Sequence, residues 1–130
     1  MRKFSKHSQE KLATCHPDLI TLFSHVIDIV DCTIICGYRG LNEQEEAFRL
    51  GQSKLHYPDS KHNSLPSKAV DAALYPIDWN NKVGFYYFAG IVRGVADRLA
   101  IKIRWGGDWD GDADLKDQTF FDLPHFELID

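Results

Sequence analysis

The segment Ala69-Val-Asp71-Ala-Ala-Leu74 is a short apolar run that contains one carboxylate. A run of this length, stopped by Pro76, predicts a buried β-strand. A carboxylate inside such a strand costs free energy unless it is paired with a cation or bound to a metal. Asp71 therefore predicts a polar centre built on a sheet, unless the residue lies in a turn or caps a helix.

Outward from this strand, helical and extended patterns alternate along the chain. Apolar residues at steps of three and four predict helices, short apolar runs predict strands, and Asn42 and Glu45 have the spacing of a capping box. Helices that come early and between short strands indicate an α+β domain rather than a doubly wound sheet. The predicted helices are 17–30, 42–51 and 83–99, and the predicted strands are 32–36, 69–74, 101–105 and 125–129.

Composition and charge exclude several classes of protein. The 130 residues, 44% apolar and 26% charged, fit one globular domain. No apolar run approaches the roughly 18 residues of a membrane span, and none follows the basic start as in a secretory signal. We therefore expect no membrane insertion and a start in the cytoplasm of the producing cell. The net charge of −4 argues against a nucleic-acid partner.

Two histidines are candidates to join Asp71 in a metal site. His62 lies in a long polar loop, 52–68, and His125 opens the final strand after Pro124. Two histidines and one carboxylate suit a divalent metal, and three protein ligands leave a fourth position for water, which is typical of catalytic zinc. Alternatively, His62 is a solvated loop residue.

Asp122 and Arg39 are candidates for the chemistry itself. Asp122 lies three residues before His125, and Pro124 argues against a helix, so we expect Asp122 in a bend before the strand. There it could take a proton from a metal-activated water, or be an ordinary turn carboxylate. Arg39, in a glycine-flanked turn, could bind a substrate carboxylate or stabilise an oxyanion, or form a surface ion pair.

Two further residues are candidates to support the metal ligands. Glu127 is two residues beyond His125, on the same face of a regular strand, where it could orient that ligand. Ser60, two residues before His62, is a candidate for the same kind of role. An exposed or ion-paired Glu127 is the alternative.

The acidic charge is concentrated near the end of the chain. Residues 1–105 carry a net charge of +3 and residues 106–130 carry −7, which suggests a bound cation. Alternating carboxylates around Gly111 resemble a calcium loop, although the bidentate Glu of an EF-hand is missing. A solvated acidic loop, spanning 106–118, is the alternative. The candidate calcium ligands are Asp108, Asp110, Asp112 and Asp114.

Taken in order, five motifs resemble those of the phage L-alanyl-D-glutamate peptidases, endolysins within the zinc D-alanyl-D-alanine carboxypeptidase and dipeptidase group. The resemblance implies that His62, Asp71 and His125 hold one catalytic Zn²⁺. It further implies that Asp122 is the general base and that Arg39 orients substrate or stabilises an oxyanion. The motifs are Gly37-Tyr-Arg39-Gly40 with the Gln44 helix, Ser60-Lys-His62, Ala69-Val-Asp71, Trp105-Gly-Gly-Asp108-Trp109, and Asp122-Leu-Pro-His125-Phe-Glu127.

The resemblance also implies an architecture and a biological role. The fold would be a small central antiparallel sheet with flanking helices, as in hedgehog-type domains and DD-peptidases. Residues 1–130 would form a single zinc peptidase domain without a separate cell-wall-binding domain. The protein would act as a monomer on bacterial peptidoglycan, cleaving the L-Ala–D-Glu bond during host lysis, after a separate holin-type protein gives it access to the wall.

Other functions share these motifs. A D-Ala-D-Ala carboxypeptidase or dipeptidase of wall metabolism needs the same metal chemistry, and a zinc-containing binding module of this fold needs the metal without a base. A structural virion part predicts no metal-dependent hydrolysis. Eight residues separate His62 from Asp71, whereas many relatives have six, so we expect the loop to bulge before the strand.

Overall fold

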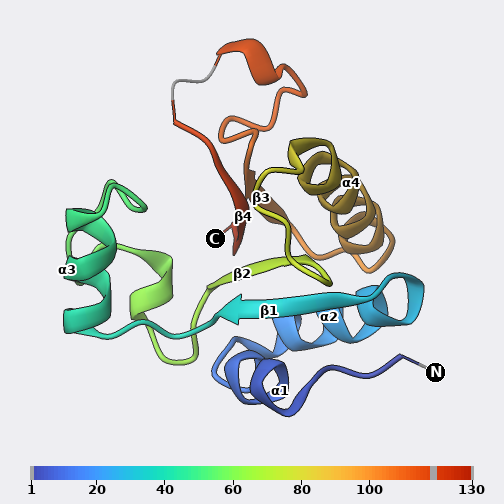
Figure 1. The fold of residues 1–130 in the computed structure, drawn as a ribbon, viewed down its shortest axis with the longest axis horizontal. Coiled ribbons are helices and arrows are strands. Elements are labelled where there is room, and N and C mark those ends of the chain that lie inside the picture. Colours follow the sequence, from blue (N-terminus) through green and yellow to red (C-terminus); the bar gives the residue numbers. More distant parts are fainter. Residues whose placement is uncertain (1, 118–119, 130) are drawn as a thin grey trace.

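The computed structural model describes residues 2–117 and 120–129, and it has the α+β architecture predicted from the sequence (Figure 1). Within these ranges, four α-helices and two short 3-10 helices accompany four strands. The helices are α1 (Lys6–Leu12), α2 (Pro17–Ile29), α3 (Leu41–Arg49), η1 (Lys61–Asn63), α4 (Lys82–Arg98) and η2 (Leu115–Asp117). The strands are β1 (Cys32–Cys36), β2 (Ala69–Leu74), β3 (Ile103–Gly106) and β4 (Asp122–Leu128).

The four strands form one antiparallel sheet in the order β1-β2-β4-β3. In the β2–β4 pair, Asp71 lies opposite His125 and Val70 lies opposite Phe126. Since successive side chains of a strand point to opposite faces, Asp71 and His125 share the face that Val70 and Phe126 do not. The register of this one pair therefore brings two predicted metal ligands together.

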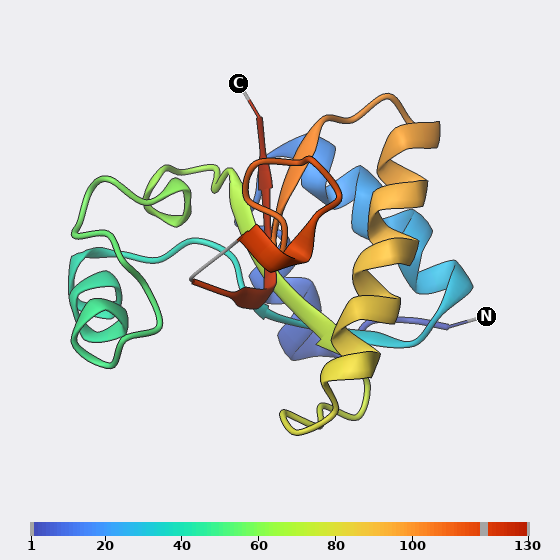
Figure 2. The same cartoon turned by 90° about the horizontal axis from the view of Figure 1, so that it is seen from above.

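The other face of the sheet carries the hydrophobic core. Helix α4 packs on β2, β3 and β4, and α2 packs beside α4. Phe126 is fully buried there, with its ring centroid 5.9 Å from that of Phe23 in α2 and 6.0 Å from that of Phe88 in α4. Helices α3 and η1 lie to one side, away from α2 and α4 (Figures 1 and 2). The opposite face, which carries Asp71 and His125 and which we call the polar face, is therefore covered by loops and holds the site.

Strand β4 begins at Asp122, so the prediction of a bend there is wrong. Pro124 is tolerated inside the strand because the pairing with β3 jumps from Trp105–Phe126 to Gly106–Asp122, and such a bulge needs no hydrogen bond from proline. A side chain at Gly106 would clash with the backbone carbonyl of Asp122. The glycine thus allows β3 to approach and fix Asp122.

Two helix starts differ from those predicted. Helix α3 begins at Leu41 after Gly40, so the predicted capping box is wrong, because Asn42 already lies inside the helix. Helix α1 was not predicted; its N-cap is Ser5, whose hydroxyl accepts a hydrogen bond from the backbone of Ser8. Across the described residues, the helices are too short or too polar to cross a membrane.

Candidate metal centre and active site

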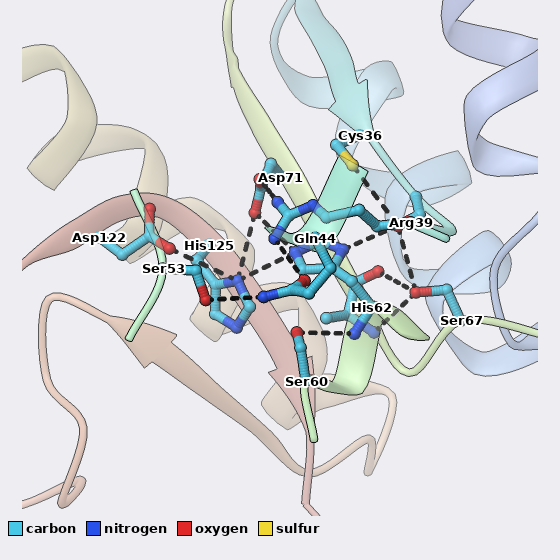
Figure 3. A network of polar contacts seen from close by, with 12 residues as sticks. Cys36, Arg39, Gln44, Ser53, Ser60, His62, Ser67, Asp71, Asp122 and His125 are labelled. Atoms are coloured by element: carbon cyan, nitrogen blue, oxygen red, sulfur yellow. Dashed lines mark hydrogen bonds and ion pairs between the residues drawn. The ribbon is translucent and has the colours of Figure 1, made fainter. Parts of the chain in front are cut away.

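The three predicted metal ligands come together on the polar face of the sheet (Figure 3). His62 is the middle residue of η1, Asp71 lies in β2 and His125 lies in β4. His62 Nε2, Asp71 Oδ1 and His125 Nδ1 form a triangle in which each pair of atoms is 3.2 Å apart. Both histidines are almost fully buried. The structure therefore brings the three candidate ligands together.

Hydrogen bonds on the far side of each ring fix which nitrogen faces the centre. His62 Nδ1 donates to the backbone carbonyl of Gly37 at 2.7 Å, and His125 Nε2 donates to Glu127 Oε1 at 2.8 Å. Each ring thus uses its N–H outward and turns its other nitrogen inward. This arrangement is typical of histidines that ligate a metal.

The triangle has the dimensions and the donor set of a metal site. Ligand distances of about 2.0–2.1 Å in a tetrahedral zinc site separate neighbouring ligand atoms by about 3.3–3.4 Å, close to the separations found. Two inward ring nitrogens and a carboxylate oxygen at this spacing repel one another unless a positive charge lies between them. The residues present therefore fit a divalent cation.

The electrostatics of the centre favour positive charge. Burial opposes protonation of His62 and His125, but the Asp71 carboxylate outweighs it and raises the pKa of His62 to about 10. Hydrogen bonds that the His125 ring donates to the carboxylates of Asp71 and Glu127 likewise raise the pKa of His125 to about 9. Burial would raise the pKa of Asp71, yet the two histidines hold it well below its usual range. Protons and a metal ion therefore compete for the same place.

A pH dependence of stability follows for the protein prepared with a chelator. The pKa values of His62 and His125 lie above the ordinary value of 6.5, so their stabilisation is complete below about pH 6.5 and is lost as pH rises toward 9–10. We expect the free energy of unfolding to fall over this range, by at most about 1.4 kcal/mol per pH unit for each proton released. Urea unfolding at pH 6 to 10 measures it. The exposed His25→Gln control should keep the decline, and a stability that rises with pH would contradict this account.

Asp122 lies beside the triangle. Its Oδ2 is 3.7 Å from His125 Nδ1, and about a quarter of its side chain is exposed. Burial, followed by the charge of Asp71, raises the pKa of Asp122 to about 6. A carboxylate with a pKa near neutral pH can both accept and return a proton.

Arg39 reaches the centre from the loop after β1. Its Nη2 is 3.4 Å from Asp71 Oδ2, and its backbone N–H donates to the carbonyl of His62 at 2.8 Å. The Arg39 side chain is 13% exposed, so the alternative of a solvated surface ion pair does not apply. The guanidinium is held beside the ligands with a part of its edge accessible.

Comparison with known proteins places the chain in a family. The model of a family described as phage L-alanyl-D-glutamate peptidase matches residues 1–129. The chain belongs to this family. It is 31% identical over 135 residues to the L-alanyl-D-glutamate peptidase of Escherichia phage T5, with 98% of each protein covered. The predicted family is thus confirmed.

The fold is also that of a solved relative. The crystal structure of the L-Ala D-Glu endopeptidase ChiX of Serratia marcescens matches with a TM-score of 0.73 and 28% sequence identity. The match covers 98% of this chain and 91% of that one. The α+β class with a small antiparallel sheet, predicted from the sequence, is therefore confirmed for this member of the phage L-alanyl-D-glutamate peptidase family.

Gln44 is a residue of the site to which sequence analysis assigned no role. It is fully buried in α3, and its Oε1 accepts from Arg39 Nη1 at 3.0 Å and from Asn63 Nδ2 at 3.2 Å. Its Nε2 donates to Ser53 Oγ at 2.9 Å and to the carbonyl of Leu55 at 2.7 Å. One amide thus ties Arg39 to η1 and to the loop before it. The only sequence signal was its place in the Arg39 motif.

Ser60 and Glu127 each form a hydrogen bond with one of the two candidate histidine ligands. Ser60 Oγ accepts from the backbone N–H of His62 at 3.2 Å and so caps η1. Glu127, besides accepting from His125, lies 3.3 Å from Arg104 Nη1 and 3.7 Å from Lys61 Nζ. Glu127 is therefore mostly buried and ion-paired, so the ion-paired alternative and the contact with His125 are both present.

The acidic loop brings three of its four candidate carboxylates together. Ligand oxygens of Asp108, Asp110 and Asp112 lie within 4.8 Å of one another. Asp108 is buried; its Oδ2 accepts from the N–H of Ala113 at 3.0 Å, and Oδ1 is without a hydrogen-bond partner among the described residues. Asp114 is not part of this group, and its Oδ1 accepts from the N–H of Lys116 at 2.9 Å. Gln118, the predicted end of the loop, is outside the described residues.

Proposed function

We propose that this chain is a zinc peptidase that hydrolyses the L-Ala–D-Glu bond in the peptide stems of bacterial peptidoglycan, as a phage endolysin in host lysis. The observation that carries the proposal is the triangle of His62, Asp71 and His125 with Asp122 beside it. Membership of the phage L-alanyl-D-glutamate peptidase family supports the proposal that the L-Ala–D-Glu bond is the one cleaved. The similarity to the phage T5 peptidase supports the proposed role in a phage.

The site residues have distinct roles under this proposal. A divalent ion held by His62 Nε2, Asp71 Oδ1 and His125 Nδ1 would polarise the scissile carbonyl and lower the pKa of a water molecule. Asp122 accepts the proton of the attacking water and then delivers it to the nitrogen of the departing D-Glu. Arg39 donates hydrogen bonds to the oxygen on which negative charge develops.

Zinc is the metal that best suits these ligands. Two imidazole nitrogens and one carboxylate oxygen form a mixed set that zinc accepts in catalytic sites, whereas magnesium and calcium prefer oxygen ligands alone. Both histidines are buried, and they line a cavity that Asp122 and Arg39 also line. Substrate and water would enter through that cavity.

Digestion of purified peptidoglycan tests the proposed reaction. We expect new peptides that begin with D-Glu and glycan fragments that end in L-Ala, identified by mass spectrometry of the soluble and insoluble fractions. Release of free D-Ala without these products would identify a carboxypeptidase or dipeptidase instead. Binding to peptidoglycan without any cleavage would identify the non-catalytic alternative. In lysis, a separate holin-type protein would provide access to the wall.

We further propose that the acidic loop binds a calcium ion through Asp108, Asp110 and Asp112. The proposal rests on the convergence of the three carboxylates and on the unpartnered, buried Oδ1 of Asp108. Trp109, within the loop, has its ring centroid 5.5 Å from that of His125. A calcium ion that orders the loop would therefore also hold the Trp109 ring beside His125.

Calcium titration measures this second site. We expect one Ca²⁺ per chain, with a dissociation constant of about 10⁻⁵–10⁻³ M, and a higher melting temperature when it is bound. Asp112→Asn should weaken binding at least about tenfold, because it removes a charged ligand. Asp97→Asn, a matched change in α4, should leave it unaltered. Equal binding by wild type and Asp112→Asn would contradict the proposal.

A further inference from the structure

Two cavities meet at the candidate active site. One has a volume of about 410 Å³ and includes His62 and His125 in its wall, and the other, of about 480 Å³, includes Asp71. Arg39 and Asp122 line both. A substrate chain lying through the two cavities would therefore pass directly over the reacting groups.

The two cavities differ in the segments that line them beside their shared residues. The wall of the first includes residues 53–55 and 59–62, shortly before β2, whereas the wall of the second includes Trp79, Lys82 and Phe85, shortly after β2, together with Gly51 and Gln52. The green segment that leads to η1 and the yellow segment that leads into α4 lie on different sides of the start of β4 (Figure 2). The cavities are thus two arms of one cleft.

The two arms differ in chemistry. The arm before β2 contains Lys54 and Lys61 besides Arg39, together with the acidic Asp59 and Glu127. Lys54 Nζ lies 5.3 Å above the ring of Phe120, a residue that lines both arms. The arm after β2 has seven apolar lining residues, four of them aromatic, besides polar and acidic ones, and Lys82 is its one cation besides Arg39 among the described lining residues. Its apolar residues are Ile35, Trp79, Phe85, Phe120, Phe121, Leu123 and Pro124.

We call the arm after β2 the aromatic arm, and Trp79 gives it a flat surface. Its indole stacks on Phe85 with ring centroids 5.6 Å apart and an interplanar angle of 24°, yet 60% of the residue remains exposed. Phe121, in the same wall, is 44% exposed. Aromatic side chains held in place but left open at a cavity are suited to bind a ligand with an apolar face.

We propose that the aromatic arm binds the N-acetylmuramic acid that carries the stem peptide, with Trp79 packed against the sugar ring. This inference rests on the proposed cleavage of L-Ala–D-Glu. In peptidoglycan, the amine of L-Ala is bonded to the lactyl group of that sugar, so the sugar lies next to the scissile residue on its amino side. The D-Glu side carries a free carboxylate, which matches Lys54 in the other arm. The direction of the substrate in the cleft is thereby assigned.

The test compares two soluble substrates. One is N-acetylmuramyl-L-Ala-D-Glu-diaminopimelic acid, and the other has an acetyl group in place of the sugar. For Trp79→Ala, we expect the ratio of kcat/KM for the first substrate over the second to fall about tenfold from the wild-type ratio, mainly through KM. Phe121→Ala should lower the ratio in the same direction and does not disturb the Trp79–Phe85 stack. Tyr87→Ala, an exposed aromatic of α4 outside both arms, should keep the wild-type ratio.

The outcomes separate this inference from the proposed function. An unchanged ratio in both Trp79→Ala and Phe121→Ala, or an equal loss on both substrates, would overturn the inference while cleavage by wild type still stands. If the loss caused by Trp79→Ala grew with the length of the peptide beyond D-Glu and did not depend on the sugar, the substrate would lie in the opposite direction. That result would also overturn the inference. Failure of the wild-type protein to cut intact peptidoglycan would instead overturn the proposed function.

Discussion

Replacing Asp122 by Asn is expected to lower kcat by about 10²–10⁴-fold, the usual contribution of a general acid–base group. The amide has nearly the size of the carboxylate, so it fits the same partly buried position 3.7 Å from His125 Nδ1. It cannot accept the proton of the attacking water. We therefore expect the metal content and the KM to stay near those of wild type while turnover is lost, measured by release of D-Glu amino termini from peptidoglycan.

The pH profile separates loss of a base from loss of structure. Because burial raises the pKa of Asp122 to about 6, and a bound cation nearby would lower it, wild-type kcat should fall as pH drops through about 6 or below. Protonated Asp122 cannot act as a base, so this acidic limb should be missing in Asp122→Asn. Asp78→Asn, a change at an exposed position, should retain it. A variant Asp122→Asn with more than about a tenth of wild-type kcat would contradict the assignment.

Replacing His62 by Ala is expected to remove both bound metal and activity. The change leaves two of the three proposed ligands. Replacing a residue that only orients a metal ligand already costs about 10–100-fold in metal affinity. We expect a larger loss here, with activity below about 1% of wild type at metal concentrations that saturate wild type. Metal analysis after dialysis, together with the peptidoglycan assay, measures both effects.

A second histidine serves as the control for this experiment. His56 lies in the same long segment before η1, but it is exposed and its Nδ1 is 3.0 Å from Glu45 Oε2, away from the triangle. His56→Ala should keep one metal per chain and nearly full activity. If His62→Ala retained stoichiometric metal, the three-ligand centre would be wrong.

The three candidate metal ligands could be proposed from the sequence because one of them breaks an apolar pattern. Asp71 stands inside an apolar strand, where a carboxylate needs a cation, and the candidate partners were His62 in the long polar loop and His125 at the start of the last strand. The sequence could not show which ring nitrogen faces inward. For His62 the choice depends on the carbonyl of Gly37, which lies 25 residues earlier in the chain. For His125 it depends on Glu127, the residue that the sequence indicated for this role.

Other features had no readable signal. Helix α1 buries only Ser8 and Leu12, so it has no apolar periodicity to detect. Pro124 argued for a bend at Asp122, because the bulge that accommodates it depends on the pairing with β3. Glutamine is usually a surface residue, so the sequence did not indicate that Gln44 is buried. Its polar atoms are satisfied by hydrogen bonds to Arg39, Ser53 and Leu55, which lie near it only in the folded chain.

Zinc titration of chelator-treated protein is the most direct measurement of the central claim, that one metal held by His62, Asp71 and His125 enables cleavage of the L-Ala–D-Glu bond. The release of L-Ala carboxyl termini and D-Glu amino termini from peptidoglycan should be absent without metal. It should rise in proportion to added zinc and reach its maximum at one zinc per chain. Full activity in the chelator-treated protein, or metal-dependent release of D-Ala alone, would contradict the account.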